Sequence, residues 1–298
     1  MIDYIKGYFL DKNKAYEHIE STYGMNSIHY SRYNKKQQKM INYDSYFKDF
    51  HNMNVKITNK KGLVENSLHV LYNNMNGAEI NRNDNDFCYS DLLTTLDFVK
   101  DVSDYSLDHI YLGQNLEFGF NLKVPFDVDK FILNECVLYD YKPHTWLENT
   151  SEKTLKSFTK GYYRFKIYNK AKQFSLTHQL LRIELKFIDK RGFNDLGIYS
   201  TADLADKENL YSIYELMYRL IDEKLMIIDN IEIPNLTEYK KRKLYRYTSA
   251  KFWSELPTTR LNIEKMTCQK LLKKNNLLTN KKILLELMES KFFELIDR

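Results

Sequence analysis

The sequence predicts an α+β fold, in which a mostly antiparallel sheet carries helices on one face and a small helical region follows at the C-terminus. Short alternating segments and segments with helical spacing follow one another up to about residue 188. Beyond about residue 200, apolar residues recur at helical spacing almost throughout. We therefore expect one domain over residues 1–230 and a helical appendage over residues 231–298.

The N-terminal part of the chain contains short strand signals within a polar, tyrosine-rich stretch. Residues 2–9 alternate between polar and apolar side chains, and residues 54–58 indicate a further strand. Residues 67–72 look extended as well. Residues 73–77 are rich in Asn and end in Gly, and both residue types tolerate left-handed backbone conformations, so we expect a turn there.

A helix, a strand and a second helix are expected next. Ser90 can cap a helix over residues 91–100, in which the carboxylate of Asp91 opposes the helix dipole. Residues 116–124 alternate as a strand. Residues 127–139 then have the apolar spacing of a helix.

Two strand-like runs lie between residues 161 and 187, joined by a short polar connection. In the first run, alternation places five side chains on one face, namely Tyr162, Arg164, Lys166, Tyr168 and Lys170. In the second run, Arg182, Glu184 and Lys186 project together, opposite an apolar face. This arrangement indicates either a chemical site or the solvated face of an antiparallel sheet, where charges pair across strands.

Helices are expected over most of the remaining chain. Residues 202–228 have helical spacing and contain neither Gly nor Pro, which predicts one or two helices. The final 40 residues read as two amphipathic helices divided near residues 275–280.

The composition limits the classes of protein and site. At 298 residues with 43% hydrophobic residues, the chain can bury a sizeable core. Its three cysteines lie far apart and form no CxxC pair, which excludes a disulfide framework and a thiolate zinc site. No run approaches the ~20 apolar residues that cross a bilayer, so we expect a cytoplasmic protein without a membrane partner.

The net charge of +5 is too small to indicate nucleic-acid binding, but the distribution of the charge is more informative. Residues 239–246 read YKKRKLYR, in which basic residues can neutralise phosphates and aromatic rings can stack on unpaired bases. A solvated helix face or linker is the alternative. With the basic side chains of the two strand-like runs, the candidate nucleic-acid contacts are Arg164, Lys166, Arg182, Lys186, Lys240, Lys241, Arg242, Lys243, Tyr245 and Arg246.

Several segments, in order, resemble the replication initiators of filamentous phages and small rolling-circle plasmids. Tyr168 is followed closely by Lys170, and the second run reads Leu-Arg-Ile-Glu-Leu. The opening MIDYIKGYF, the Ser-Leu-His and Tyr-Ser-Asp-Leu segments and the strand LEFGFNL add to the resemblance. It covers most of residues 1–200 and implies a palm-like sheet of the HUH-like nuclease superfamily.

The resemblance implies an enzyme that nicks and rejoins DNA at a replication origin, and so initiates rolling-circle replication. A tyrosine hydroxyl would attack the phosphodiester, and Tyr168 is the expected nucleophile, with Tyr162 on the same face as the second candidate. A phenol ionises near ~10, so Lys166 and Lys170 would favour the phenolate and hold the phosphate. The expected partners are single-stranded or melted origin DNA and a host helicase.

The expected cofactor is Mg²⁺ or Mn²⁺, since hard cations prefer oxygen ligands. Glu117 and Glu184 are each the only acid of their strand and are the first candidate ligands, with Asn121 and His144 as further ligands. We expect Tyr168, Glu117 and Glu184 to share one pocket. For each glutamate, an ion pair with a neighbouring cation is the alternative.

One departure from the family pattern favours a second function. The His-hydrophobic-His metal motif that is common in rolling-circle nucleases does not occur in this sequence. The alternative is a non-catalytic DNA-binding or copy-control protein, or an RNA-binding regulator, on the same scaffold.

Overall fold

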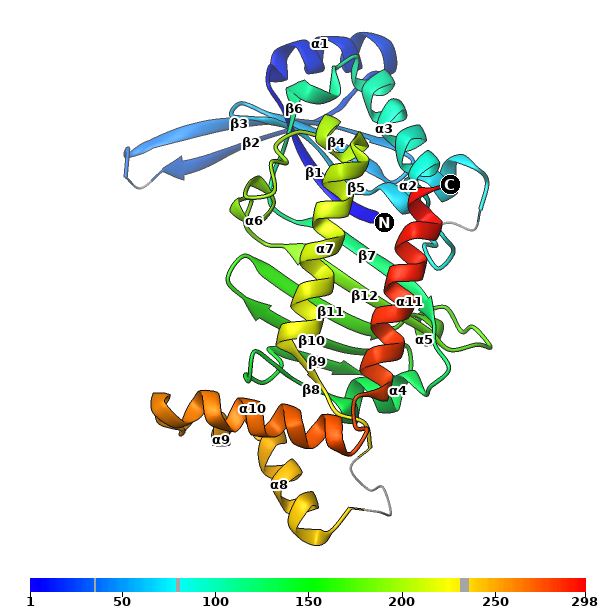
Figure 1. The fold of residues 1–298 in the computed structure, drawn as a ribbon. Helices are drawn as coiled ribbons and strands as arrows, with labels where there is room; N and C mark the ends of the chain where they lie inside the picture. Colours follow the sequence, from blue (N-terminus) through cyan, green and yellow to red (C-terminus); the bar gives the residue numbers. More distant parts are fainter. Residues whose placement is uncertain (35, 79–80, 231–235) are drawn as a thin grey trace. The chain divides into compact units, whose positions relative to one another are not determined.

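The computed structural model describes residues 1–34, 36–78, 81–230 and 236–298, and it confirms the α+β class with an antiparallel sheet. Within these residues the main sheet has 11 strands, in the order β2-β3-β4-β5-β1-β7-β12-β11-β10-β9, with β6 paired to β1 (Figure 1). The strands β13 (Leu225–Ile227) and β8 (Cys136–Tyr139) pair separately.

The chain divides into two compact units. Unit 1 consists of residues 1–119, 186–213 and 294–298, and unit 2 of residues 120–185 and 214–293. The predicted domain boundary between residues 230 and 231 lies at the edge of the described residues, since residues 231–235 are outside them.

Unit 1 is built on β1 (Ile2–Phe9), which has the bounds that the alternation predicts. Ile2 and Ile5 are fully buried, and β1 pairs antiparallel with β5. The further elements are α1 (Lys12–Tyr23), β2 (Asn26–Asn34), β3 (Lys39–Phe50), β4 (Met53–Thr58), β5 (Gly62–Ser67), α2 (Leu68–Met75), α3 (Tyr89–Ser103), β6 (Ile110–Leu112), the first half of β7 (Leu116–Lys123), α6 (Arg191–Asn194) and the 3₁₀ turns η1 (Leu107–His109) and η3 (Ala202–Ala205).

The extended segment predicted over residues 67–72 is wrong, because the helix α2 begins at Leu68. Ser67 is the N-cap of this helix, and its Oγ accepts a hydrogen bond from the backbone N–H of Val70 at 3.1 Å. The sequence Ser-Leu-His alternates like a strand, but a serine ahead of apolar residues is also a cap signal. In the structure, Ser67 acts as a helix cap, and residues 73–75 of the predicted turn form the last residues of α2.

The helix predicted after Ser90 exists, but it starts at Tyr89 and extends to Ser103. Cys88 occupies the N-cap position, and its backbone N–H donates to the carboxylate of Asp91 at 2.8 Å. Asp91 therefore lies in the first turn as predicted, whereas the predicted cap Ser90 is wrong because the helix begins before it, at Tyr89.

Unit 2 contains the strands β9 (Trp146–Asn149), β10 (Thr154–Lys160), β11 (Tyr163–Asn169) and most of β12 (Leu180–Phe187). Residues 127–139 were expected to form one helix and instead form the short α4 (Val128–Lys130), the π-helix η2 (Phe131–Glu135) and β8. The Nζ of Lys156 donates to the carbonyl oxygens of Leu133 and Cys136 at 2.9 and 3.0 Å. This buried lysine satisfies carbonyl groups that a longer helix would have used itself.

The helices α7 (Lys207–Lys224) and α11 (Thr279–Ile296) cover one face of the strands of unit 2. Tyr214 of α7 and Phe292 of α11 stack with their ring centroids 4.3 Å apart, and both contact Phe120 of β7. Successive residues of a strand point to opposite faces. Asn121 therefore points to the face away from these two helices.

The helical C-terminal region is confirmed as α8 (Glu238–Thr248), α9 (Ala250–Ser254), α10 (Thr258–Lys274) and α11. The first three helices form an apolar core with Leu138 and Ile228 of the same unit. Trp253 lies in this core and donates from Nε1 to the carbonyl oxygen of Tyr247 at 2.7 Å. No helix in the described parts of the chain has the length and apolar character needed to span a membrane.

Candidate active site

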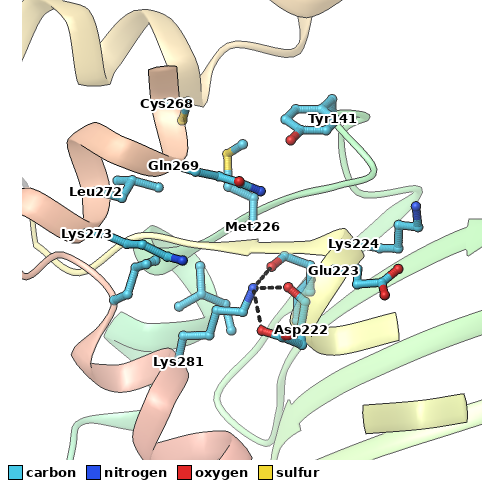
Figure 2. Close-up of a pocket in the computed structure, with 13 residues that line it drawn as sticks. Tyr141, Asp222, Glu223, Lys224, Met226, Cys268, Gln269, Leu272, Lys273 and Lys281 are labelled. Atoms are coloured by element: carbon cyan, nitrogen blue, oxygen red, sulfur yellow. Dashed lines mark hydrogen bonds and ion pairs between the residues drawn. The ribbon is translucent and has the colours of Figure 1, made fainter. Parts of the chain in front are cut away.

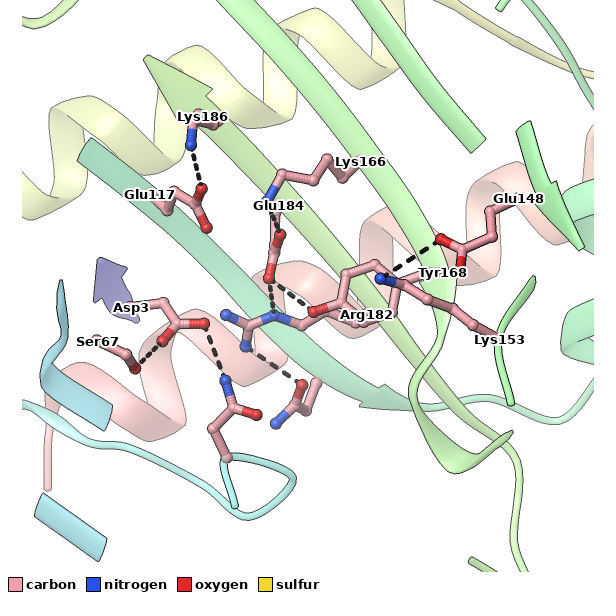
Figure 3. Close-up of polar contacts among 12 residues, drawn as sticks. Asp3, Ser67, Glu117, Glu148, Lys153, Lys166, Tyr168, Arg182, Glu184 and Lys186 are labelled. Carbon is pink, nitrogen blue, oxygen red and sulfur yellow. Dashed lines mark hydrogen bonds and ion pairs between the residues drawn. The ribbon is translucent and has the colours of Figure 1, made fainter. Parts of the chain in front are cut away.

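Glu184 of β12 lies at the centre of a polar cluster in unit 2 (Figure 3). Its Oε1 accepts hydrogen bonds from the hydroxyl of Tyr168 at 2.8 Å and from Nε of Arg182 at 3.0 Å. Its Oε2 accepts a hydrogen bond from Nζ of Lys166 at 2.8 Å. We refer to Lys166, Tyr168, Lys170, Arg182 and Glu184 as the Glu184 cluster.

The charges of the cluster favour the ionised form of its one carboxylate. Burial alone would raise the pKa of Glu184, but the charges of Lys166 and Arg182 outweigh it and hold the pKa well below its usual range. Lys170 contributes in the same direction. Three cations thus surround one anion, so the cluster has an excess of positive charge that suits a phosphate.

The end of β11 positions Tyr168 and Lys170. Asn169 caps the short helix α5 (Lys170–Gln173), because its Oδ1 accepts from the backbone N–H of Lys172 at 2.9 Å. Its Nδ2 donates to Asp129 at 2.8 Å. The turn at Asn169 places Nζ of Lys170 5.5 Å from the centroid of the Tyr168 ring.

The cluster is enclosed, and Lys166 is its most accessible charged member. Tyr168 is 7% exposed, and Lys170, Arg182 and Glu184 are 1–2% exposed. The side chain of Lys166 is 22% exposed, compared with 3% for its partner Glu184. An anion that approaches the cluster would therefore meet Lys166 first.

Two residues that the alternation places on the same face as Tyr168 contact other side chains of unit 2. Tyr162 precedes β11, is half-buried and contacts the ring of Tyr163, with centroids 6.3 Å apart. Arg164 is exposed and donates to Thr159 at 3.2 Å. Tyr162 as a second candidate nucleophile and Arg164 as a DNA contact therefore remain predictions.

The expected metal ligands already bind cations in this structure. Glu117 belongs to unit 1, where it accepts a hydrogen bond from Nζ of Lys186 at 2.8 Å. In unit 2, the guanidinium of Arg182 bridges Glu184 and the Oδ1 of Asn121, which it reaches from Nη1 at 3.2 Å. Arg182 therefore holds the position between two oxygen donors that a divalent ion would need.

In this structure, cationic side chains occupy the oxygen donors of both units. Among the described residues, no three His, Cys, Asp or Glu side chains gather as a metal site. His144 is half-buried, and burial together with the nearby charge of Lys156 lowers its pKa. A site for Mg²⁺ or Mn²⁺ on Glu117, Glu184, Asn121 and His144 stays a prediction.

No protein-family model matches the chain, and no curated protein gives a significant match.

The basic and aromatic segment at residues 239–246 forms most of α8. Leu244 and Tyr247 of this helix are buried in the apolar core. Tyr239, Arg242, Tyr245 and Arg246 are exposed, and their spacing of three and four residues places them on one side of the helix. We refer to these four residues as the α8 surface.

The other basic residues of the segment have partners within the fold. Lys240 donates to the Oδ1 of Asn275 at 3.1 Å, and Lys241 lies 3.6 Å from Glu238. The Nζ of Lys243 lies 5.9 Å from the centroid of the Tyr247 ring. Arg246 of the α8 surface also has partners, since it lies 3.9 Å from Glu264 and its guanidinium lies 4.6 Å from the centroid of the Phe252 ring. The expected DNA-binding segment is thus partly exposed and partly engaged in holding the helix in place.

A pocket of about 290 Å³ in unit 2 lies between α7, β13 and α10 (Figure 2). Lys281 enters it and donates from Nζ to the carbonyl oxygens of Asp222 and Leu225 at 2.5 and 3.2 Å. Burial lowers the pKa of Lys281. Because this lysine satisfies carbonyl groups at the C-terminal end of α7, we assign it a structural role.

Sequence reasoning missed the two residues that shape the end of β11. Asn169 and Asp129 connect α5 to α4, and the amide of Asn169 also caps α5. An asparagine between a strand and a run of Lys-Ala-Lys-Gln is a cap signal that could have been used. Asp129 gives no comparable signal, because its partner lies 40 residues further along the chain.

Proposed function

We propose that this protein is a replication initiator of the rolling-circle type, which nicks and rejoins single-stranded or locally melted origin DNA through Tyr168. The observation that supports this most is the hydrogen bond from the Tyr168 hydroxyl to Glu184, within a cluster of three cations. The substrate class, origin DNA, is supported by the order of the sequence patterns, which resembles that in phage and plasmid initiators.

In the proposed reaction, the Tyr168 oxygen attacks the phosphorus of a phosphodiester. A Tyr–O–P bond forms, and the bond from phosphorus to the 3′-oxygen breaks. The phenolic proton passes to Glu184, and the leaving 3′-oxygen takes a proton from solvent. The covalent link conserves the bond energy, so that a free 3′-hydroxyl can reverse the reaction and rejoin the ends.

Phosphate binding would make Glu184 a better proton acceptor. In the free protein, Lys166 and Arg182 hold its pKa low, which makes it a weak base. A phosphodiester that enters at Lys166 competes for these cations and adds negative charge beside the carboxylate. Both effects raise the pKa of Glu184 at the moment when the proton has to move.

The cations of the cluster have the second role, which is to stabilise the charge that develops on the phosphate. Lys166 and Lys170 act as point charges, and Arg182 can offer two parallel N–H groups. Prearranged cations of this kind supply most of the catalysis in phosphoryl transfer. These steps use only side chains of the cluster, and nicking in the presence of EDTA tests the expected need for Mg²⁺ or Mn²⁺.

The test uses labelled single-stranded DNA of randomised sequence, with Mg²⁺ or Mn²⁺, and measures cleavage and covalent adduct. We expect an adduct with the wild type and none with Tyr168→Phe, while Tyr162→Phe serves as the matched control and keeps activity. Glu184→Gln should lower cleavage by about 10²-fold or more, since it removes the proton acceptor. Undiminished adduct with Tyr168→Phe would reject the proposal.

One observation favours the second candidate, a DNA-binding or copy-control protein without catalysis. Each Glu184 oxygen already binds a cation, as in a buried ion-pair network that serves stability alone. DNA binding that weakens with salt, without any cleavage under either metal, would support this candidate.

A further inference from the structure

The strands β2 and β3 continue beyond the rest of unit 1 as a two-stranded ribbon. β3 pairs with β4 from Ser45 to Phe50, and its first part, Lys39–Asp44, pairs in the described residues with His29–Asn34 of β2. Figure 1 shows this hairpin extending away from the other strands of unit 1. We call residues 29–34 and 39–44 the ribbon. Six residue pairs correspond to a length of about 20 Å.

The ribbon exposes large side chains on both of its faces. Tyr30, Tyr33 and Met40 are 52%, 54% and 57% exposed. Soluble proteins rarely expose several large side chains together on a projecting element without a binding role. A long exposed edge strand such as β2 also presents unpaired backbone N–H and C=O groups to a partner.

The two faces differ in chemistry. One face has the stacked pair Tyr30 and Tyr43, with centroids 5.2 Å apart, next to Arg32 and Lys39. On the other face, the hydroxyl of Ser31 donates to the Oδ1 of Asn42 at 2.6 Å, beside the cross-strand pair Tyr33 and Met40.

The sign of the charge identifies the kind of partner. Residues 31–42 contain four basic residues and no acidic residue. Arg32, Lys36 and Lys39 are exposed. The nearest acid, Asp44, lies at the base of the ribbon and binds the ring of His29 at 2.7 Å. The end of the ribbon is therefore uniformly positive.

We propose that the ribbon enters the major groove of duplex DNA. The major groove is about 12 Å wide and admits a two-stranded ribbon, whereas single-stranded DNA has no groove to receive one. The face with Ser31 and Asn42 then meets the base edges, and the longer side chains of Arg32, Lys36 and Lys39 extend past the edges of the hairpin to the phosphates on either side of the groove.

This inference rests on the proposed function only for the choice of DNA as the ligand. It concerns binding of a duplex by unit 1, whereas the proposed function concerns cleavage of a single strand by unit 2. The two can therefore fail separately.

The test measures binding of the full chain to labelled duplex DNA of mixed sequence over a range of salt concentrations. We expect Arg32→Ala/Lys36→Ala/Lys39→Ala to weaken binding more than about tenfold and to lower the slope of log affinity against log salt by about 3. Lys270→Ala/Lys274→Ala/Lys282→Ala is the control, because it removes the same charge from exposed positions of α10 and α11 and should leave both values unchanged.

A second variant replaces residues 31–42 with Asn-Gly, which closes a tight hairpin after Tyr30. The removed residues are mostly exposed, so circular dichroism and single-strand cleavage should match the wild type while duplex binding is lost. Duplex affinity equal to the wild type in either variant would overturn the inference. A change of molar mass in solution with unchanged duplex binding would also overturn it, and would assign the ribbon to contact with a second copy of the chain.

Discussion

At the scale of single residues, the Glu184 cluster makes one carboxylate important for stability. Removing the charge in Glu184→Gln leaves Arg182 buried without its anion, and we expect the free energy of unfolding to fall by roughly 3–5 kcal/mol. Urea unfolding at neutral pH measures this change. Glu286→Gln is the control, because it breaks the exposed pair with Lys282 and should cost no more than about 1 kcal/mol.

The same carboxylate makes the free energy of unfolding depend on pH. The folded pKa of Glu184 lies below its unfolded value of ~4.3, so its contribution is present above that pH and is lost as the pH falls below it. Unfolding measured at pH 7 and at pH 3 should therefore show a larger loss in the wild type than in Glu184→Gln. Equal losses in the two proteins would contradict the assigned charge state.

Strand alternation was sufficient to bring some of these residues together. It placed Lys166 with Tyr168, and Arg182 with Glu184, and these pairs belong to one cluster in the structure. Alternation could not predict that the cluster would be buried, because burial depends on what covers the sheet. It also could not predict that Lys186 would bind Glu117 rather than Glu184, since that partner lies on another strand.

At the scale of elements, Ser67 decides where β5 ends and α2 begins. Its hydroxyl caps α2 and donates to Asp3 at 2.5 Å. We expect Ser67→Ala to lower the free energy of unfolding by about 1–2 kcal/mol, because the cap is lost and buried Asp3 loses a donor. Ser254→Ala in the exposed end of α9 is the control, and a similar loss in both variants would contradict the capping role.

The α8 surface leads to a prediction about single-stranded DNA. Arg242→Ala/Arg246→Ala should weaken binding of single-stranded DNA and lower its salt slope by about 1.4, since each phosphate contact contributes ~0.7. Fluorescence anisotropy over a range of salt concentrations measures both. Lys270→Ala/Lys274→Ala removes two exposed charges from α10 and is the matched control. Equal effects in the two variants would show that only total charge matters.

The elements that the sequence predicted well have a strong local signal. β1 and the two C-terminal helices follow from alternation and from helical spacing. The π-helix η2 and the strand β8 were missed, because they depend on contacts with Lys156 and β13. Local periodicity contains no information about such partners.

At the scale of the whole molecule, the C-terminal helices complete the core of unit 2. Phe292 packs on Phe120 and Tyr214, and Leu244 and Trp253 belong to the same core as Ile228. A chain that ends at Asn230 should therefore expose this apolar surface, bind a hydrophobic dye and lose cooperative thermal unfolding. A chain that lacks only the last two residues is the control, because these follow α11 and should not affect unfolding. Cooperative unfolding of the shorter chain would contradict this role.

The division into two units was beyond the reach of the sequence. Each unit combines segments that lie far apart in the chain, and α7 and α11 each contribute residues to both. A change in composition, such as the one near residue 230, can only divide the chain into consecutive segments. The two units instead depend on pairing between strands that lie far apart in the sequence, and local sequence patterns do not reveal such pairing.

The central claim is that Tyr168 forms the covalent bond to DNA, and mass spectrometry of the trapped adduct tests it most directly. Cleavage after lysine and arginine releases Tyr168 in the peptide Ile167–Lys170 and both Tyr162 and Tyr163 in the peptide Gly161–Arg164. We predict that the nucleotide mass is found on Ile167–Lys170. Its presence on Gly161–Arg164, or on any other peptide, would contradict the account.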